Sequence, residues 1–275
     1  MGPIGIFDSG IGGLTVARAA CDLLPNESIL YFGDTAHLPY GEKSPELIRK
    51  YSTRIALHLV NSGCKAIVVA CNSASSNALR QVVDAVGESI PVIDMVHPVV
   101  EAICSEESSE SVSDCNKKVG LIGTRATISS GLYKSAVEAL NQTRGSSIDL
   151  ISRPTPLLAS AIEEGFYNDT IPGAVLEAYL EDGYFSEVDS MILGCTHYPL
   201  VRDEVMSMLP KSVEVIDSPK IVALALKSKL ENLGLLNADS AVSSNRFQVS
   251  DLTENFRLGA QRFFSSDIDL EEVVL

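Results

Sequence analysis

The amino-acid sequence predicts an α/β fold made of two similar domains, each with a mainly parallel sheet flanked by helices. Three observations support this prediction. Short apolar runs alternate with helical patterns through the first hundred residues, the same pattern starts again near residue 118, and an apolar run ends at a cysteine in each half. Neighbouring parallel strands need a crossover between them, so this alternation is typical of parallel sheets.

The first half contains four predicted strands, at residues 4–7, 29–32, 66–70 and 91–94. The helices expected between and after them span residues 15–24, 45 to about 62, 73–86 and about 98–104. Ser44 followed by Pro45 marks a helix start, because Ser caps free N–H groups and Pro fits the first helical turn.

The second half repeats this order after residues 105–118, which are rich in Ser and Glu and predict a solvated loop. We expect strands at residues 118–123, 148–152 and 189–194, and helices at about 157–164 and 173–181. A strand at 214–216, a helix to about 232, a strand at 246–250 and a helix at 253–264 follow. We expect this tail to pack on the first unit, which gives a first domain of residues 1–97 plus 211–275 and a second of residues 98–210.

Composition limits the class of protein. Of the 275 residues, 45% are hydrophobic and 21% charged, enough to form a core, and the net charge of −15 argues against partners such as nucleic acid or an anionic membrane surface. No apolar run is long enough to span a bilayer, and the N-terminus reads as a strand rather than a signal peptide. We therefore expect a cytoplasmic protein.

Six cysteines and four histidines show no metal-binding spacing. The cysteines form no C-x-x-C pair, so free thiols are expected rather than a disulfide framework, and the histidines form no paired motif. A zinc site has little support, and we expect no metal.

Two of the cysteines follow strands at matching places. Cys71 follows the apolar run 67–70, and Cys195 follows 191–194. The carboxyl end of a parallel strand is where an open α/β sheet carries its chemistry, although a free Cys is commonly just a small buried hydrophobe. A helix after Cys71 is expected to lower the pKa of its thiol, and His197 offers Cys195 a base or a cationic neighbour.

The first strand leads into Asp8-Ser9-Gly10-Ile11-Gly12-Gly13. Its glycines fit neither the dinucleotide fingerprint nor the phosphate-binding loop. The segment instead presents a carboxylate and a hydroxyl at a strand end, beside glycines that let a ligand approach the backbone. The helix N-terminus that follows favours an anion such as a carboxylate.

Four runs of the sequence together resemble the glutamate racemase family, within the wider aspartate/glutamate racemase superfamily. They are residues 8–14, 33–41, 70–75 and 194–199, and residues 123–127 and 162–165 also fit. The resemblance implies a cofactor-independent enzyme of two α/β domains, with the active site in the cleft between them. It implies interconversion of L- and D-glutamate for peptidoglycan synthesis, with a homodimer as one candidate assembly.

Carried over by position, the resemblance makes Cys71 and Cys195 the two acid/base thiols, assisted by Asp8, Glu163 and His197. The implied substrate-binding residues are Asp8, Ser9, Tyr40, Gly41, Asn72, Ser73, Thr124, Thr196 and His197. Ser73 stands where the family more often has Thr, and His37 where Arg is common. Glu164 adjoins Glu163, so which of the two faces the site stays open.

Two opposed thiols suit racemisation, because one removes the Cα proton while the other returns a proton to the opposite face. Hydrogen bonds to the substrate carboxylate would stabilise the deprotonated carbon without a cofactor. Three alternatives remain: racemisation of aspartate or another amino acid, an amino-acid-binding or regulatory protein without turnover, and a cysteine hydrolase, which needs only one thiol.

Overall fold

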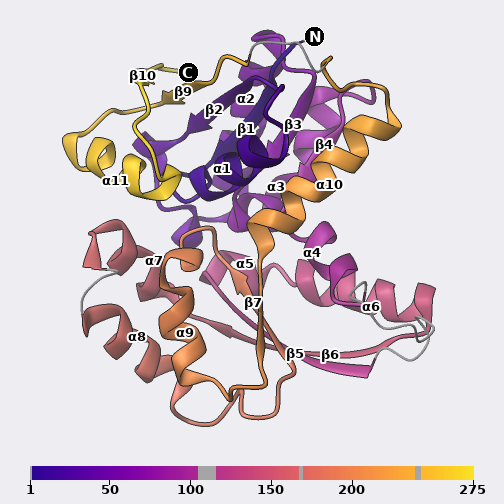
Figure 1. The fold of residues 1–275 in the computed structure, drawn as a ribbon, viewed down its shortest axis with the longest axis vertical. Helices are drawn as coiled ribbons and strands as arrows, with labels where there is room; N and C mark the ends of the chain where they lie inside the picture. Colours follow the sequence, from indigo (N-terminus) through magenta and orange to yellow (C-terminus); the bar gives the residue numbers. More distant parts are fainter. Residues whose placement is uncertain (1, 105–115, 167–169, 239–242) are drawn as a thin grey trace.

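The chain forms two parallel sheets, one above the other in Figure 1. The structure is a computed structural model, and it describes residues 2–104, 116–166, 170–238 and 243–275. The predicted loop at 105–118 therefore lies outside the described residues up to 115, and residues 116–118 begin a strand. All paired strands in the described part run parallel, which confirms the predicted fold class.

The first sheet has six strands in the order β10-β9-β2-β1-β3-β4. Their bounds are β1 Ile4–Asp8, β2 Ile29–Gly33, β3 Ala66–Val69, β4 Val92–Asp94, β9 Arg246–Val249 and β10 Leu270–Glu272. The helices of this unit are α1 Leu14–Leu23, α2 Pro45–Asn61, α3 Asn72–Val86, α10 Ser218–Asn232 and α11 Glu254–Phe264, and the single-turn helices are η1 Thr35–His37 and η2 Tyr40–Glu42.

Helices cover both faces of this sheet, because each central strand alternates buried apolar side chains between the two faces. Ile4 and Ile6 belong to the core cluster that includes α1, α10 and α11. Phe7 belongs to the cluster beneath α2 and α3. As predicted, Ser44 caps α2, with its hydroxyl accepting from the Leu47 N–H, and Pro45 is the first helical residue.

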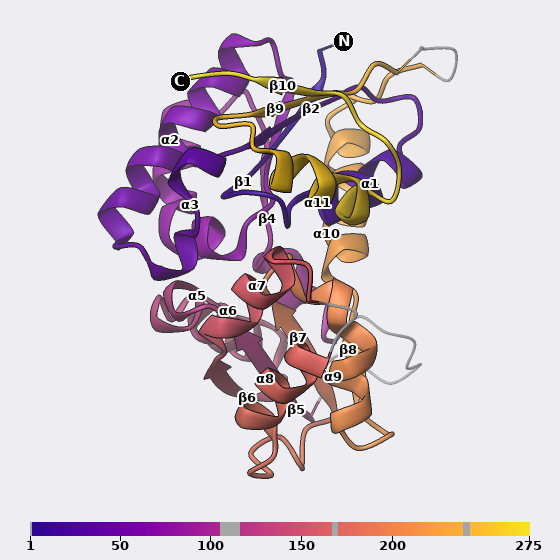
Figure 2. The same cartoon turned by 90° about the vertical axis from the view of Figure 1, so that its left-hand side faces the viewer.

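The second sheet has four strands in the order β6-β5-β7-β8. Its strands are β5 Asn116–Gly123, β6 Ser147–Pro154, β7 Ser190–Gly194 and β8 Glu214–Ile216. Its helices are α5 Arg125–Ser129, α6 Leu132–Arg144, α7 Pro156–Glu163, α8 Thr170–Leu180 and α9 Arg202–Met208, with η5 Tyr198–Val201, and α4 His97–Ala102 lies between the sheets in the chain order. Figure 2 shows the two units meeting along one side of each.

The tail divides between the units. Strand β9 pairs with β2, and α10 and α11 pack against α1, so most of the tail lies on the first unit. Strand β8 instead pairs with β7 in the second sheet. The second sheet therefore reaches Ile216, past residue 210, because a short connection after α9 returns the chain beside β7.

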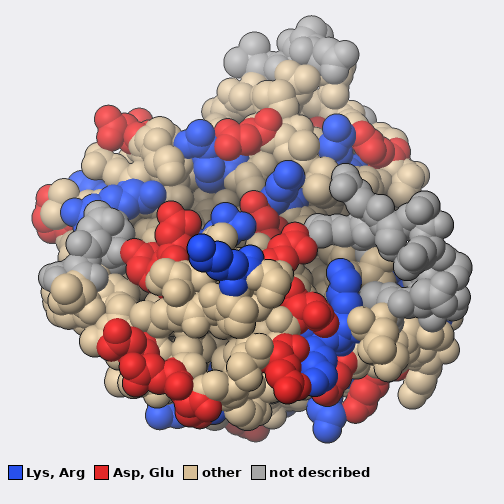
Figure 3. Space-filling model, turned by 60° about the horizontal axis from the view of Figure 1, so that its bottom comes forward, with Lys and Arg blue, Asp and Glu red and all other residues tan. Residues whose placement is uncertain are grey.

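No helix in the described ranges is long and apolar enough to cross a membrane. Figure 3 shows acidic and basic side chains interspersed on one face of the molecule, without a continuous basic patch on that face.

Candidate active site

The carboxyl ends of four central strands meet at one pocket between the two units. Ser9 follows β1, Cys71 lies beyond β3, Thr124 follows β5 and Cys195 follows β7, and all four line this pocket. Parallel strands present their carboxyl ends at a common edge, so the two sheets bring these side chains together from opposite sides.

Eleven of the twelve predicted site residues line this pocket. They are Ser9, Tyr40, Gly41, Cys71, Asn72, Ser73, Thr124, Glu163, Cys195, Thr196 and His197. The twelfth, Asp8, does not line the pocket. It lies behind it, with only 1% of its surface exposed.

Five further residues line the pocket and were not predicted: Pro39, Glu42, Pro156, Ala159 and Ser160. The last three lie on α7, within one or two turns of Glu163. Helical spacing from Glu163 was a usable signal for Ala159 and Ser160, because residues three and four apart share a helix face.

Cys71 is the N-cap residue of α3, and its sulfur accepts a hydrogen bond from the Ala74 N–H at 3.4 Å. The thiol donates to the Ser9 hydroxyl at 3.6 Å. Burial raises the pKa of the Cys71 thiol, and the nearby Asp8 raises it further, while the helix N–H and Ser9 lower it. The helix N–H does lower this pKa, as expected, but desolvation outweighs the helix, so the net shift of the Cys71 pKa is upward.

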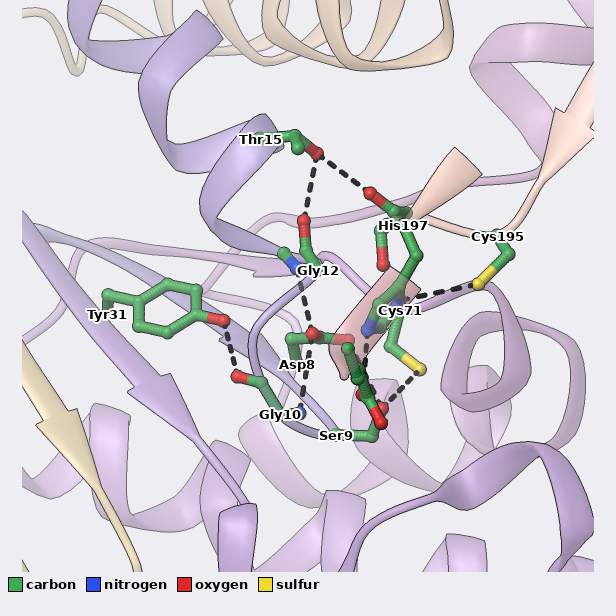
Figure 4. A network of polar contacts seen from close by, with 12 residues as sticks. Asp8, Ser9, Gly10, Gly12, Thr15, Tyr31, Cys71, Cys195 and His197 are labelled. Carbon is green, nitrogen blue, oxygen red and sulfur yellow. Dashed lines mark hydrogen bonds and ion pairs between the residues drawn. The ribbon is translucent and has the colours of Figure 1, made fainter. Parts of the chain in front are cut away.

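Asp8 is held by backbone donors from its own loop. Its Oδ2 accepts from the Gly13 N–H at 2.8 Å and the Gly10 N–H at 3.3 Å (Figure 4). Burial raises the pKa of Asp8 above its ordinary value, against the opposing effect of the His197 charge and of these N–H groups. A carboxyl group behind Cys71 is thus close enough to influence the thiol without contacting the pocket.

Cys195 stands at the end of a chain of three side chains. Its sulfur lies 3.5 Å from Nδ1 of His197, and Nε2 of His197 lies 2.7 Å from Oε1 of Glu163. Burial opposes the charge on His197, but Cys195 and Glu163 outweigh it, and the pKa of His197 lies well above its ordinary value. Glu163, rather than Glu164, therefore faces this site; Glu164 lines a neighbouring groove with Asp251.

The two units are in close contact beside the series Cys195–His197–Glu163. A Cβ atom on Gly12 would lie 2.4 Å from Thr196 Oγ1 and 2.5 Å from His197 Nδ1, so no larger residue fits there. The Thr15 hydroxyl donates to the Thr196 carbonyl at 3.3 Å, and Ser73 Oγ lies 2.8 Å from Thr124 Oγ1. Ser73 thus keeps the hydroxyl contact across the units that a Thr would also offer.

His37 does not line the pocket. Its Nδ1 lies 2.8 Å from Asp34 Oδ1, and its ring stacks on Tyr51 with centroids 4.1 Å apart. Asp34 also accepts a short hydrogen bond from the Tyr40 hydroxyl. His37 is therefore linked to Tyr40 through two shared neighbours, Asp34 and Tyr51.

Among the described residues, four cysteines are free thiols, namely Cys21, Cys64, Cys71 and Cys195, whereas Cys104 is disulfide-bonded, contrary to the expectation for that residue. In the part of the chain that the structure describes, no group of three His, Cys, Asp or Glu side chains is placed to hold a metal ion.

The geometry defines a class of site before any comparison is made. Two thiols from opposite units line one small polar pocket, each with its own ionisable partners, and Figure 4 shows both sulfur atoms on the same side of the network. Such a pocket can exchange protons with one bound carbon from two directions.

Comparison with known proteins agrees with this class. Residues 15–226 match the model of the Asp/Glu/hydantoin racemase family. A glutamate racemase of Chlorobium phaeobacteroides is 38% identical over 274 residues, covering 99% of this chain and 96% of that protein. One of Thermus thermophilus is 39% identical over 260 residues, covering 94% and 91%.

Solved structures give the same result. The crystal structure of glutamate racemase from Francisella tularensis in complex with D-glutamate has a TM-score of 0.88 and 35% identity, over 99% of this chain and 97% of that chain. The Thermus thermophilus enzyme in complex with β-chloro-D-alanine has a TM-score of 0.85 and 38% identity, over 100% and 97%.

The chain belongs to the Asp/Glu/hydantoin racemase family. It is an amino-acid racemase, an isomerase, and its resemblance to glutamate racemases is confirmed over nearly the whole chain.

Proposed function

We propose that this protein interconverts L- and D-glutamate without a cofactor, using Cys71 and Cys195 as its two acid/base groups. The observation that carries this proposal is that both thiols, from opposite sheets, line one pocket. The glutamate racemase relatives at 35–39% identity support glutamate as the substrate.

The surroundings of the thiols support different starting states. The raised pKa of Cys71 favours its thiol form, whereas Cys195 has the His197 ring, whose own pKa is raised, beside it as a proton partner. In one direction, the Cys195 thiolate takes the Cα proton and Cys71 gives its proton to the opposite face. The reverse direction exchanges the two roles, and Asp8 and the His197–Glu163 pair assist the thiol that each adjoins.

The intermediate carries negative charge that spreads from Cα into the substrate carboxylate. Hydroxyl and amide groups around the pocket are suited to stabilise it, because donors preorganised in a desolvated site act more strongly than water. We propose that substrate is bound by Asp8, Ser9, Tyr40, Gly41, Asn72, Ser73, Thr124, Thr196 and His197, with Asp8 acting from behind through the loop of residues 9–13.

Purified protein in heavy water, without added pyridoxal phosphate, tests the reaction. We expect proton NMR to show loss of the Cα–H signal of either glutamate enantiomer, and polarimetry to show conversion to the racemate. Dependence on pyridoxal phosphate, or unchanged turnover in Cys71→Ala, would contradict the two-thiol mechanism.

The same assay separates the other functions. Faster exchange with aspartate than with glutamate would favour an aspartate racemase, and binding without exchange would favour a regulatory protein. A cysteine hydrolase needs only one thiol, so it would lose activity when one particular cysteine is replaced and keep it when the other is replaced. The requirement for both distinguishes the racemase.

We further propose a cytoplasmic role in supplying D-glutamate for peptidoglycan, no nucleic-acid or membrane partner, and a homodimer as the assembly to test by light scattering. We also propose two domains, residues 1–97 plus 211–275 and residues 98–210, with the exception that strand β8, at 214–216, belongs to the second sheet because it pairs with β7. Depletion of the protein should lower the cellular pool of D-glutamate.

A further inference from the structure

Asn72 carries an unsatisfied donor at the edge of the pocket. The residue is 97% buried and lines the pocket, yet its Nδ2 has no hydrogen-bond partner among the described residues. A buried N–H group without a partner is unfavourable, because the hydrogen bonds that it loses with water are not replaced. An acceptor supplied by a ligand would remove this cost.

The other end of the same amide is held from the opposite unit. The hydroxyl of Tyr133, on α6, donates to Oδ1 of Asn72 at 2.8 Å, and Tyr133 is itself only 2% exposed. Burial raises the pKa of Tyr133, as do the Asp94 and Cys195 charges, so the hydroxyl keeps its proton and remains a donor.

An asparagine amide has almost the same shape after a half-turn, but the turn exchanges its oxygen with its NH₂ group. A donor fixed at one end therefore decides which group the other end presents. With the Tyr133 hydroxyl on Oδ1, the remaining group is Nδ2.

We propose that Tyr133 is a positioning residue, which orients Asn72 so that Nδ2 donates to a carboxylate oxygen of the bound amino acid. The inference rests on the proposed function and extends it. Because Asn72 belongs to α3 and Tyr133 to α6, this donor is set only when the two units are together.

The variant Tyr133→Phe removes only the hydroxyl. We expect kcat/KM for both enantiomers of glutamate to fall about tenfold, the effect of losing about one hydrogen bond. We also expect a similar weakening of D-glutamate binding by titration calorimetry, which requires no turnover.

A double-mutant cycle separates positioning from general destabilisation. If Tyr133 acts through Asn72, Tyr133→Phe has no further effect on kcat/KM or on binding in the Asn72→Ala background. A further tenfold loss in that background would overturn the proposal, as would unchanged kcat/KM in the single variant.

Tyr198→Phe is the matched control. It also removes a fully buried tyrosine hydroxyl of the second unit, but that hydroxyl contacts Thr155, which does not line the pocket. Its effect, whatever the size, should be equal in both backgrounds. Absence of exchange in the unaltered protein contradicts the proposed function, whereas exchange without loss in Tyr133→Phe contradicts only the positioning role.

Discussion

Cys71 and Cys195 hold equivalent places at the ends of β3 and β7, but the two surroundings differ in charge. Cys71 adjoins a carboxyl group, Asp8, and a helix N-terminus, and the pKa of its thiol is raised. Cys195 adjoins an imidazole that is itself paired with Glu163. Similar backbone positions therefore carry an acid-like thiol on one side and a thiol with a cationic partner on the other.

This difference teaches that the two halves of the pocket need not be mirror images for the reaction to run both ways. The substrate enantiomers differ only at Cα, and each thiol meets one face of that carbon. What matters in each direction is that one thiol holds a proton when the other does not.

The largest expected effect comes from removing either sulfur. Cys71→Ala and Cys195→Ala should each lower racemisation by about 10²–10⁴-fold, the usual contribution of a general acid or base. Exchange of Cα–H with heavy water should persist slowly for one enantiomer in each variant, and the favoured enantiomer should differ between them. Proton NMR measures this exchange. If both variants exchanged the Cα–H of the same enantiomer, the assignment of one thiol to each face of Cα would be contradicted.

The next effect separates two neighbouring glutamates. Glu163→Gln weakens a hydrogen bond to a charged ring, so kcat/KM should fall about 10–100-fold. Because Glu163 helps raise the pKa of His197, the variant lowers that pKa, and the alkaline limb of the pH–rate profile should move to lower pH.

Glu164→Gln is the control for this pair, since Glu164 does not line the pocket. Its kcat/KM and pH profile should stay within about twofold of the unaltered protein. Equal losses in the two variants would show that net charge in this helix, rather than the contact with His197, matters.

The smallest effect concerns stability on the Cys71 side. The pKa of Asp8 is raised in the folded protein, so the folded state holds this proton more tightly than the unfolded chain, and ionised Asp8 costs stability above the unfolded value of about 3.8. Asp8→Asn removes the charge and keeps the carbonyl oxygen that accepts from Gly13. We expect Tm at pH 7 to rise by about 2 °C, with the gain shrinking towards pH 4. Calorimetry over this pH range tests it, and a Tm that falls at pH 7 would contradict the sign.

Much of the site could be predicted from local sequence, because parallel strands carry their chemistry at one edge. Short polar segments after apolar runs were sufficient to find Ser9, Cys71 and Cys195, and all three line the pocket, whereas Thr124, which also lines it, was given only by the family resemblance. The fold class followed from the same alternation of strands and helices.

Contacts between units could not be predicted in this way. The hydrogen bond from Tyr133 to Asn72 joins residues 61 positions apart, and the raised pKa of Cys71 depends on burial that no local pattern reports. Strand β8 belongs to the second sheet because it pairs with β7, and the sequence of a short strand does not report which strand it pairs with.

Helix α6, by contrast, left a local signal that we did not use. Its buried residues Tyr133, Val137 and Leu140 are spaced four and three apart, and Gly131 and Gly145 flank it with positive φ angles of 72° and 70°. This spacing and these glycines are typical of an amphipathic helix with defined ends.

The C-terminal helix α11 adds a consequence for synthesis on the ribosome. Phe263 packs edge-on against the His197 ring, with centroids 5.4 Å apart. Both cysteines are therefore translated before Phe263, the aromatic residue that packs against one side of the His197 ring. A nascent chain from which α11 has not yet emerged holds every proton-transfer group, but it lacks the Phe263 ring that packs against His197.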